Sequence, residues 1–366
     1  MVLTESLPEY QAFAREQGGE AVASVGDGEL RLLRRLVDTP TLDALLSAAR
    51  TSMNFDTELD TVDGEATFLA TIVEDGETVD ETLAALLRPV LEERLLPHLR
   101  AAYGSPDVTV TDALVRRYLP DERTGLRAHY DVSAFATAIV PLVAADAYEG
   151  GLYVQGAPDD ASRRIVRLER GDVLLHQWDV MHGVHVTAGE RYSLVLWFSE
   201  SDAARRAGAC PWVRRAAEAG GNGDGAGHSG SSGHPAAQFI LGTLHYDGLF
   251  GEVRDAAQAA RWFAHAAHGG SAHAQLWLAT MYANGEGGLP VDFMTARQHW
   301  RAAADAGLAA AQFALATAYE HGYGGASDRA EAVRWLRAAA AQGHAPSLAR
   351  LGELEAVEDG ASTDVR

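Results

Sequence analysis

Residues 171–198 read GDVLLHQWDVMHGVHVTAGERYSLVLWF. Two β-rich runs in this stretch flank His182, and Arg191 opens the second of them. Upstream, residues 129–131 read His-Tyr-Asp, and side chains at i and i+2 on a strand point to the same face. The sequence therefore predicts two histidines, a carboxylate and an arginine carried by short strands.

More predicted elements surround this stretch. Short β-rich runs separated by turn residues lie at 108–118, 136–143, 151–155 and 165–168. Before them, apolar residues at helical spacing predict two short helices over 27–50 and one long helix over 81–103. The expected N-terminal fold class is α+β, an antiparallel sandwich or barrel with supporting helices, of which a double-sheet jelly roll is one form.

Composition limits the function classes. The chain has 366 residues, 47% hydrophobic and 22% charged, which is a globular balance with room for two domains. All 30 basic residues are arginine, so Schiff-base and P-loop lysine chemistry are excluded. The net charge of -21 disfavours binding to nucleic acid.

Cellular location is predicted from the cysteine count and from hydropathy. Cys210 is the only cysteine, which excludes an intrachain disulfide and a thiolate-rich zinc site and favours a reducing compartment. The polar start is unlike a signal peptide, and no run of about 18 apolar residues follows. We expect a soluble cytoplasmic protein without a membrane segment.

An internal repeat occupies the C-terminal part. The pair Ala-Gln recurs at residues 237–238, 274–275 and 311–312, each time 37 residues after the last. Each unit reads as a helix, a glycine-containing turn and a second helix, with Trp262, Trp300 and Trp335 marking the second helices as core residues. Such a period with this alternation predicts an all-α helical solenoid.

These repeats resemble Sel-one-like repeats, a branch of the tetratricopeptide-like superfamily, over roughly 235–352. Residues 212–220 look like the second helix of a degenerate leading unit. Between that helix and the repeats, residues 220–233 contain seven glycines in fourteen positions. The expected domains are therefore 1–205, a linker at 206–234 with this glycine-rich insert, and repeats at 235–356, which would bind a protein or peptide partner.

The ligand-type residues point to iron. His129, Asp131 and His182 would form a two-histidine, one-carboxylate facial triad, which leaves open positions on Fe(II) for 2-oxoglutarate and O2. Arg191 would bind the distal carboxylate of 2-oxoglutarate through its planar guanidinium. His185 is the rival third ligand, and residues 245–247 repeat the His-Tyr-Asp pattern at a predicted helix end, where i and i+2 do not face each other.

The segment 114–199 resembles the prolyl-4-hydroxylase-like branch of the 2-oxoglutarate/Fe(II) dioxygenases. The resemblance rests on the two ligand motifs, on Arg191, and on the glycine pair at 150–151. It implies a double-stranded β-helix with its core at about 106–200, and oxidative decarboxylation of 2-oxoglutarate to succinate and CO2 coupled to substrate hydroxylation. By motif position, Tyr118, Thr137 and Ser193 would also bind the cosubstrate, and ascorbate would be an optional cofactor.

Three functions remain open at this point. The first is hydroxylation of a peptide or protein side chain that the solenoid recruits. The second is oxidation of a small molecule, with the repeats serving oligomerisation or localisation. The third is a catalytically silent scaffold that binds partners through its repeats.

Overall fold

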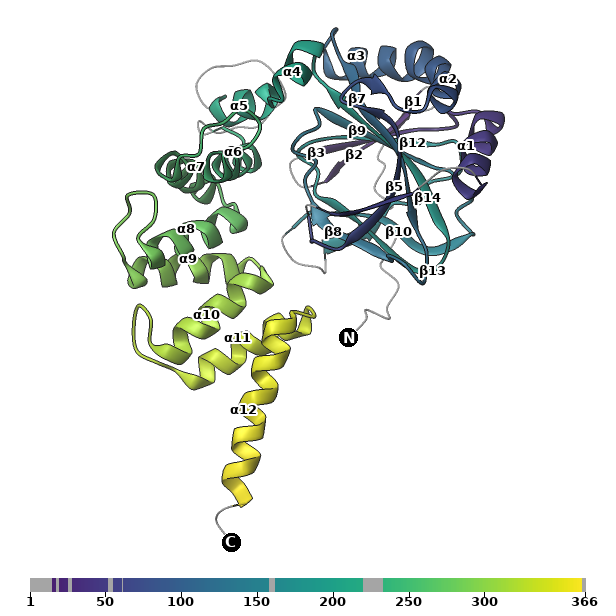
Figure 1. Cartoon of the computed structure of the whole chain (residues 1–366). Coiled ribbons are helices and arrows are strands. Elements are labelled where there is room, and N and C mark those ends of the chain that lie inside the picture. Colours follow the sequence, from purple (N-terminus) through teal and green to yellow (C-terminus); the bar gives the residue numbers. More distant parts are fainter. Residues whose placement is uncertain are drawn as a thin grey trace. The chain divides into compact units, whose positions relative to one another are not determined.

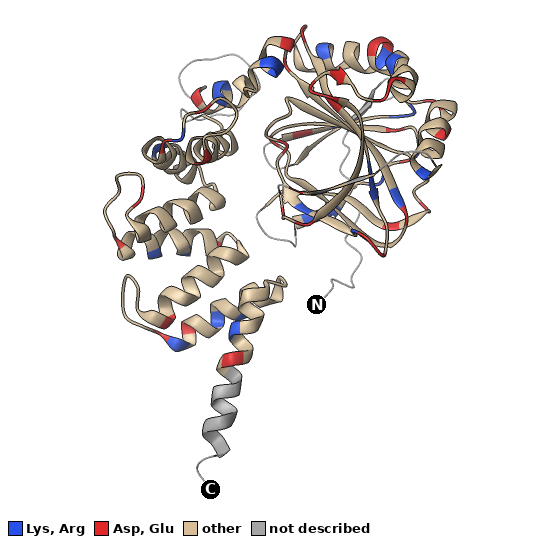
Figure 2. Cartoon of the chain, in the orientation of Figure 1, with Lys and Arg blue, Asp and Glu red and all other residues tan. Residues whose placement is uncertain are grey.

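The computed structural model describes residues 15–17, 20–25, 28–51, 55–60, 62–157, 162–219 and 233–363. The chain divides into two compact units, with the main boundary between Trp212 and Val213. The first unit is rich in β-structure and the second is helical, as expected from the change in sequence pattern (Figure 1). Acidic and basic residues are interspersed along both units (Figure 2).

The larger sheet of the first unit has ten strands, which pair antiparallel. In spatial order they are β1 (Arg15–Gln17), β2 (Glu20–Val25), β3 (Gly28–Leu33), β12 (Val173–Gln177), β9 (Ala136–Pro141), β14 (Arg191–Ser199), β7 (Thr109–Tyr118), β5 (Ala66–Glu74) and β4 (Asp56–Leu59), with β6 (Glu77–Thr78) beside β5. Its middle strands are almost wholly buried, which explains their near-continuous apolar sequences.

A second sheet of four antiparallel strands faces the larger one. Its order is β11 (Arg163–Ile165), β10 (Tyr148–Gln155), β13 (His182–Gly189) and β8 (Gly125–His129). Apolar side chains of both sheets meet in one core, among them Leu126 and Leu152 from the smaller sheet and Ile139 and Leu174 from the larger. The predicted double-stranded β-helix is therefore confirmed, and Figure 1 shows its two sheets.

Supporting helices belong to the same unit. They are α1 (Thr39–Thr51), α2 (Glu81–Val90), a π-helical turn (Leu91–Leu95) and α3 (Leu96–Tyr103). The predicted long helix is thus present, with a π-helical turn in its middle. Asp80 begins it by accepting a hydrogen bond from the Leu83 amide, which satisfies an otherwise free donor.

One predicted pair of helices is wrong. Residues 28–33 form strand β3 and only the later part of 27–50 is helical, as α1. In β3, Leu30 and Leu32 are fully buried and the strand pairs with both β2 and β12. The two leucines therefore follow the two-residue alternation of a strand. The segment is so rich in leucine that its leucines also fit a helical spacing by coincidence, which is why a helix was predicted.

The second unit is a stack of paired helices. They are α6 (Pro235–Asp247), α7 (Ala256–His268), α8 (Ala272–Asn284), α9 (Phe293–Asp305), α10 (Ala309–His321), α11 (Arg329–Ala341) and α12 (Ala345–Thr363). Aspartates cap the second helix of each pair, at Asp255, Asp292 and Asp328, and left-handed glycines end the first. Trp300 and Trp335 are buried as predicted, whereas Phe263 takes the fully buried place beside half-buried Trp262.

The glutamine of each Ala-Gln pair makes a recurrent contact. Gln275 Nε2 donates to the carbonyl of Ala267 (2.9 Å) and Gln312 Nε2 to that of Ala304 (3.3 Å). Gln238 Nε2 makes the matching contact with Ala217 (3.3 Å), which lies in α5 (Pro211–Glu218). Helix α5 therefore takes the place of a preceding second helix, which supports the interpretation of residues 212–220 as a degenerate leading unit.

The rest of the predicted linker divides in two. The end of α4 (Asp202–Ala207) and α5 occupy part of residues 206–219, while residues 220–232 of the glycine-rich insert lie outside the described residues. No described helix combines the length and apolar character that crossing a membrane requires.

Candidate metal centre

The candidate metal ligands lie on, or directly after, strands of the smaller sheet. His129 is the last residue of β8 and His182 is the first of β13, and the two are opposite each other in the pairing of these strands. Asp131 follows β8 by two residues. Strand pairing thus brings together side chains that lie about 50 positions apart in the sequence.

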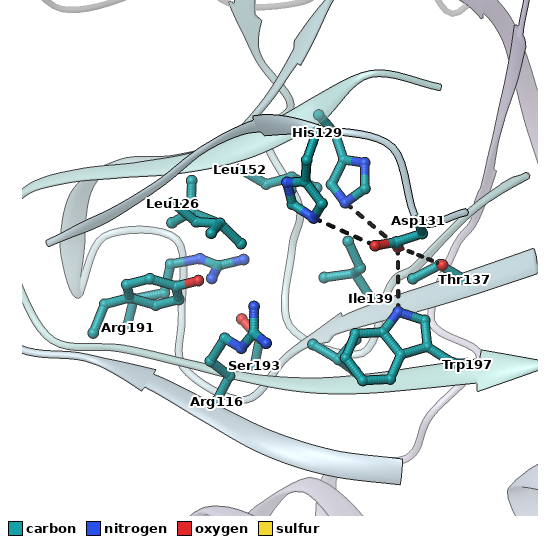
Figure 3. A pocket seen from close by; sticks show the side chains of 14 residues that line it. Arg116, Leu126, His129, Asp131, Thr137, Ile139, Leu152, Arg191, Ser193 and Trp197 are labelled. Carbon is teal, nitrogen blue, oxygen red and sulfur yellow. Dashed lines mark hydrogen bonds and ion pairs between the residues drawn. The ribbon is translucent and has the colours of Figure 1, made fainter. Parts of the chain in front are cut away.

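Three ligand atoms converge in this place. The candidate atoms of His129, Asp131 and His182 all lie within 4.8 Å of one another, and no other such group of three occurs among the described residues. His129 Nε2 lies 3.3 Å from Asp131 Oδ1, and His182 Nε2 lies 3.5 Å from Asp131 Oδ2. Figure 3 shows His129 and Asp131 directed toward each other at one end of a pocket.

Hydrogen bonds fix both imidazoles. His129 Nδ1 lies 2.9 Å from the Arg127 carbonyl, and His182 Nδ1 lies 3.1 Å from the Val180 carbonyl. A carbonyl can only accept, so each Nδ1 carries a proton, and in its neutral form each ring presents an Nε2 lone pair to the cluster. This arrangement is common for metal-binding histidines.

Asp131 is held by donors from the larger sheet. Thr137 Oγ1 of β9 donates to Asp131 Oδ2 at 2.6 Å, and Trp197 Nε1 of β14 donates to the same oxygen at 3.2 Å (Figure 3). Both bonds fix the carboxylate and leave Oδ1 on the side of His129. Such contacts orient a metal ligand before the metal arrives.

The protonation states suit a cation. Burial lowers the pKa of His182 well below its ordinary value, so this imidazole is neutral. Burial would raise the pKa of Asp131, but the neighbouring His182 and His129 outweigh it and hold that pKa well below the usual range. Burial also opposes protonation of His129, as it does for His182. The hydrogen bond from His129 to Asp131 and the attraction between the two groups outweigh burial and raise the pKa of His129. A metal ion would therefore compete with a proton at His129.

The pocket continues from the triad along β7 and β14. Arg191, Tyr118, Thr137 and Ser193 line it together with the triad, so the structure brings all seven predicted site residues into one pocket. Arg191 is 3% exposed, and its guanidinium carbon lies 5.5 Å from the centre of the Tyr118 ring.

Two of the predicted residues in this pocket have a polar atom without a protein partner. Arg191 Nε and Ser193 Oγ are buried and bond to no described residue. A buried polar atom without a partner is costly, so an anionic ligand that accepts from both would remove a penalty. A carboxylate has the charge and the acceptor geometry for this place.

The rival ligands lie elsewhere. His185 is outside the cluster, although it belongs to the same strand as His182. His245 lies at the end of α6, where its Nε2 is 3.6 Å from Glu252 Oε2, and neither it nor Asp247 belongs to a described metal-ligand cluster. The structure thus separates two identical tripeptides by their surroundings.

Some residues at or beside this site were not predicted. Trp197 shares a face of β14 with Arg191, and Arg116 shares a face of β7 with Tyr118, so the spacing of two could have identified both. His176 is 1% exposed, and its ring lies 4.3 Å from that of His182. No local pattern indicated its position.

Comparison with known proteins identifies the repeats. The Sel1 repeat family matches residues 235–271, 272–308 and 309–344, which confirms the Sel-one-like resemblance. A Sel1 repeat protein from Oxalobacter formigenes is 33% identical, with a TM-score of 0.31, over 32% of this chain. The chain spans 47% of that protein's length. No curated protein matches the chain.

Solved structures similar to the first unit include 2-oxoglutarate/Fe(II) oxygenases. One, an oxidoreductase of this family from Burkholderia pseudomallei, is 16% identical over 54% of this chain and 96% of that chain, with a TM-score of 0.40. A prolyl-4-hydroxylase from Pseudomonas putida is 18% identical over 46% of this chain and 91% of that chain, with a TM-score of 0.34. The assignment of individual site residues therefore rests on the geometry above.

Proposed function

We propose that the chain is an Fe(II)- and 2-oxoglutarate-dependent oxygenase that hydroxylates a peptide or protein side chain. The observation that carries this proposal is the convergence of His129, Asp131 and His182 at one end of a pocket whose other end holds the buried Arg191. One end suits a divalent metal ion and the other suits a carboxylate. 2-Oxoglutarate has an oxo-acid group and a distal carboxylate that match the two ends.

The donor set favours iron among the common metals. Two imidazoles and one carboxylate that leave open coordination positions are typical of non-haem Fe(II) oxygenases. His129 and His182 would supply Nε2, and Asp131 would supply Oδ1 because Thr137 and Trp197 already bond Oδ2. Bound Fe(II) would supply the activation of O2. The residues of this pocket give no support for ascorbate as a cofactor.

The remaining pocket residues have separate tasks. Arg191 would bind the distal carboxylate, with Ser193 Oγ as a second donor and Tyr118 packed beside the guanidinium. Apolar side chains, including Leu126, Ile139 and Leu152, line the walls between the two ends. They would exclude water and strengthen the electrostatic contacts of the bound dicarboxylate.

The repeats support a macromolecular substrate. Three Sel1 repeats form a helical stack, and stacked repeats commonly present extended surfaces to proteins. A protein or peptide recruited by them would bring one side chain to the metal centre. This step is a proposal about the second unit, and it can fail while the oxygenase assignment holds.

The test of the oxygenase assignment uses the full chain. Anaerobic Fe(II) loading followed by 2-oxoglutarate should produce an absorption band that needs both, and exposure to O2 should release succinate. A chain that binds neither, or that binds both without forming succinate, would contradict the proposal and favour the silent scaffold.

The test of the substrate class compares the full chain with a chain ending after Trp212, where the first unit ends. The shorter chain should fold and still convert 2-oxoglutarate slowly without substrate. Hydroxylation of a recruited protein, measured as a one-oxygen mass gain, should fall. Equal retention of both reactions would favour a small-molecule substrate.

A further inference from the structure

The pocket contains a second arginine that the proposed function leaves without a role. Arg116 lies on β7 and lines the pocket together with Arg191 of β14. In the pairing of these strands Arg116 is opposite Ser193, and Tyr118 is opposite Arg191. The four side chains therefore form one block on the inner face of the sheet. Its two arginines are diagonal neighbours, a separation that long side chains bridge.

Arg116 has a weak carboxylate partner inside the protein. Its Nη1 lies 3.8 Å from Asp60 Oδ2, near the outer limit of an ion pair. The same carboxylate oxygen lies 3.4 Å from Arg123 Nη1, so its charge is shared. Arg116 Nε is buried and bonds to no described residue. Since the Arg116 side chain is 13% exposed, little solvent offsets this deficit.

The position of Arg116 is between the two ends of the pocket. Its guanidinium carbon lies 6.0 Å from the centre of the Trp197 ring, and Trp197 donates to Asp131. Arg191 lies further along β14, over Tyr118. Figure 3 shows both guanidinium groups pointing into the pocket beside Ser193, on the side away from Asp131. A ligand that spans from the triad to Arg191 would pass Arg116.

We infer that Arg116 and Arg191 together bind the distal carboxylate of the 2-oxo acid, and that Arg116 is a specificity-determining residue for a dicarboxylate cosubstrate. This inference rests on the proposed function. A carboxylate has two oxygens and several acceptor positions, so it can accept from two guanidinium groups at once. A 2-oxo acid without the distal carboxylate would leave both guanidinium groups without this partner and should bind much more weakly.

The test is an anaerobic titration of the Fe(II)-loaded full chain with 2-oxoglutarate, followed by absorption. Arg116→Met should raise the Kd about tenfold or more, since it removes a charge-assisted contact. Arg116→Lys, which keeps the charge, should recover part of the loss. 2-Oxopentanoate, which has a methyl group in place of the distal carboxylate, should bind weakly to the unaltered chain and no more weakly to Arg116→Met.

Two matched variants separate ligand binding from a structural role. Asp60→Asn removes the carboxylate near Arg116 but leaves the guanidinium in place, so 2-oxoglutarate should bind equally well or more tightly. Asp63→Asn is its control, because Asp63 bonds Arg123 (2.7 Å) in the same cluster. If Asp60→Asn weakens binding as much as Arg116→Met does, Arg116 is part of an internal ion pair and the inference is wrong.

Other outcomes are equally decisive. Equal loss of 2-oxoglutarate and 2-oxopentanoate in Arg116→Met would place Arg116 at the metal end, which overturns the inference. So would unchanged 2-oxoglutarate binding with a loss confined to substrate hydroxylation, since Arg116 would then contact the primary substrate. In each of these results Arg191→Met should still weaken 2-oxoglutarate binding. Failure of the unaltered chain to bind 2-oxoglutarate would instead contradict the proposed function itself.

Discussion

Replacing Thr137 by valine should weaken metal binding although Thr137 is not a ligand. The 2.6 Å bond from its hydroxyl is the shorter of the two that Asp131 Oδ2 receives from Thr137 and Trp197. A hydrogen bond to a charged group contributes about 1.5–3 kcal/mol, and about 1.4 kcal/mol corresponds to a factor of ten. Because the Trp197 bond remains, we expect the lower part of this range, a loss of about tenfold in Fe(II) affinity, within the span of about 10–100-fold found for such contacts.

The assay is anaerobic competition for Fe(II) against a chromophoric chelator, repeated with Co(II). Thr137→Ser keeps the hydroxyl and should bind like the unaltered chain. Thr67→Val is the matched control: Thr67 is 3% exposed, and its Oγ1 is buried and has no described hydrogen-bond partner. If Thr137→Val and Thr67→Val bind Fe(II) equally well, the hydroxyl does not position Asp131 and the reasoning is refuted.

Three other predictions concern the same centre. Asp131→Ala should abolish Fe(II) binding, whereas the double variant His245→Ala, Asp247→Ala should bind normally; equal losses would show that the wrong tripeptide was chosen. Arg191→Met should raise the Kd for 2-oxoglutarate about tenfold or more while Fe(II) stays bound, and loss of iron with unchanged cosubstrate binding would make Arg191 structural. The pKa of His129 is raised from 6.5, so the affinity for Fe(II) should be highest above that raised pKa and should fall as the pH decreases through it. Competition with the same chelator at a series of pH values tests this expectation. An affinity for Fe(II) that does not change with pH would contradict the raised pKa of His129.

Local patterns were sufficient for much of the site. The i and i+2 positions of His129 and Asp131, and the arginine nine residues after His182, are visible in the sequence, and all of them line one pocket. What decided between the two His-Tyr-Asp tripeptides was the secondary structure around them. A strand end brought one beside His182, and a helix end kept the other apart.

Contacts between distant segments could not be read in the same way. Leu30 and Leu32 satisfied a helical spacing, and only pairing with β12 explains why they form a strand. The donation from Trp197 of the larger sheet reaches Asp131, just beyond a strand of the smaller sheet, and depends on how the two sheets pack. The leading repeat unit was easier to predict from the sequence, because its helix occupies a position that recurs in the later repeats. The contact of Gln238 with Ala217 matches the glutamine contacts of those repeats.

The pairing of His129 with His182 has a consequence for local stability. Strand β8 is an outer strand of the smaller sheet, bonded to β13 on one side. A metal ion held by both histidines would act as a cross-link between these two strands, so its binding free energy would also resist local opening of the edge. Amide hydrogens of 125–129 and 182–186 should then exchange more slowly in the loaded protein. Supply of iron would thus govern the lifetime of this sheet edge as well as the chemistry beside it.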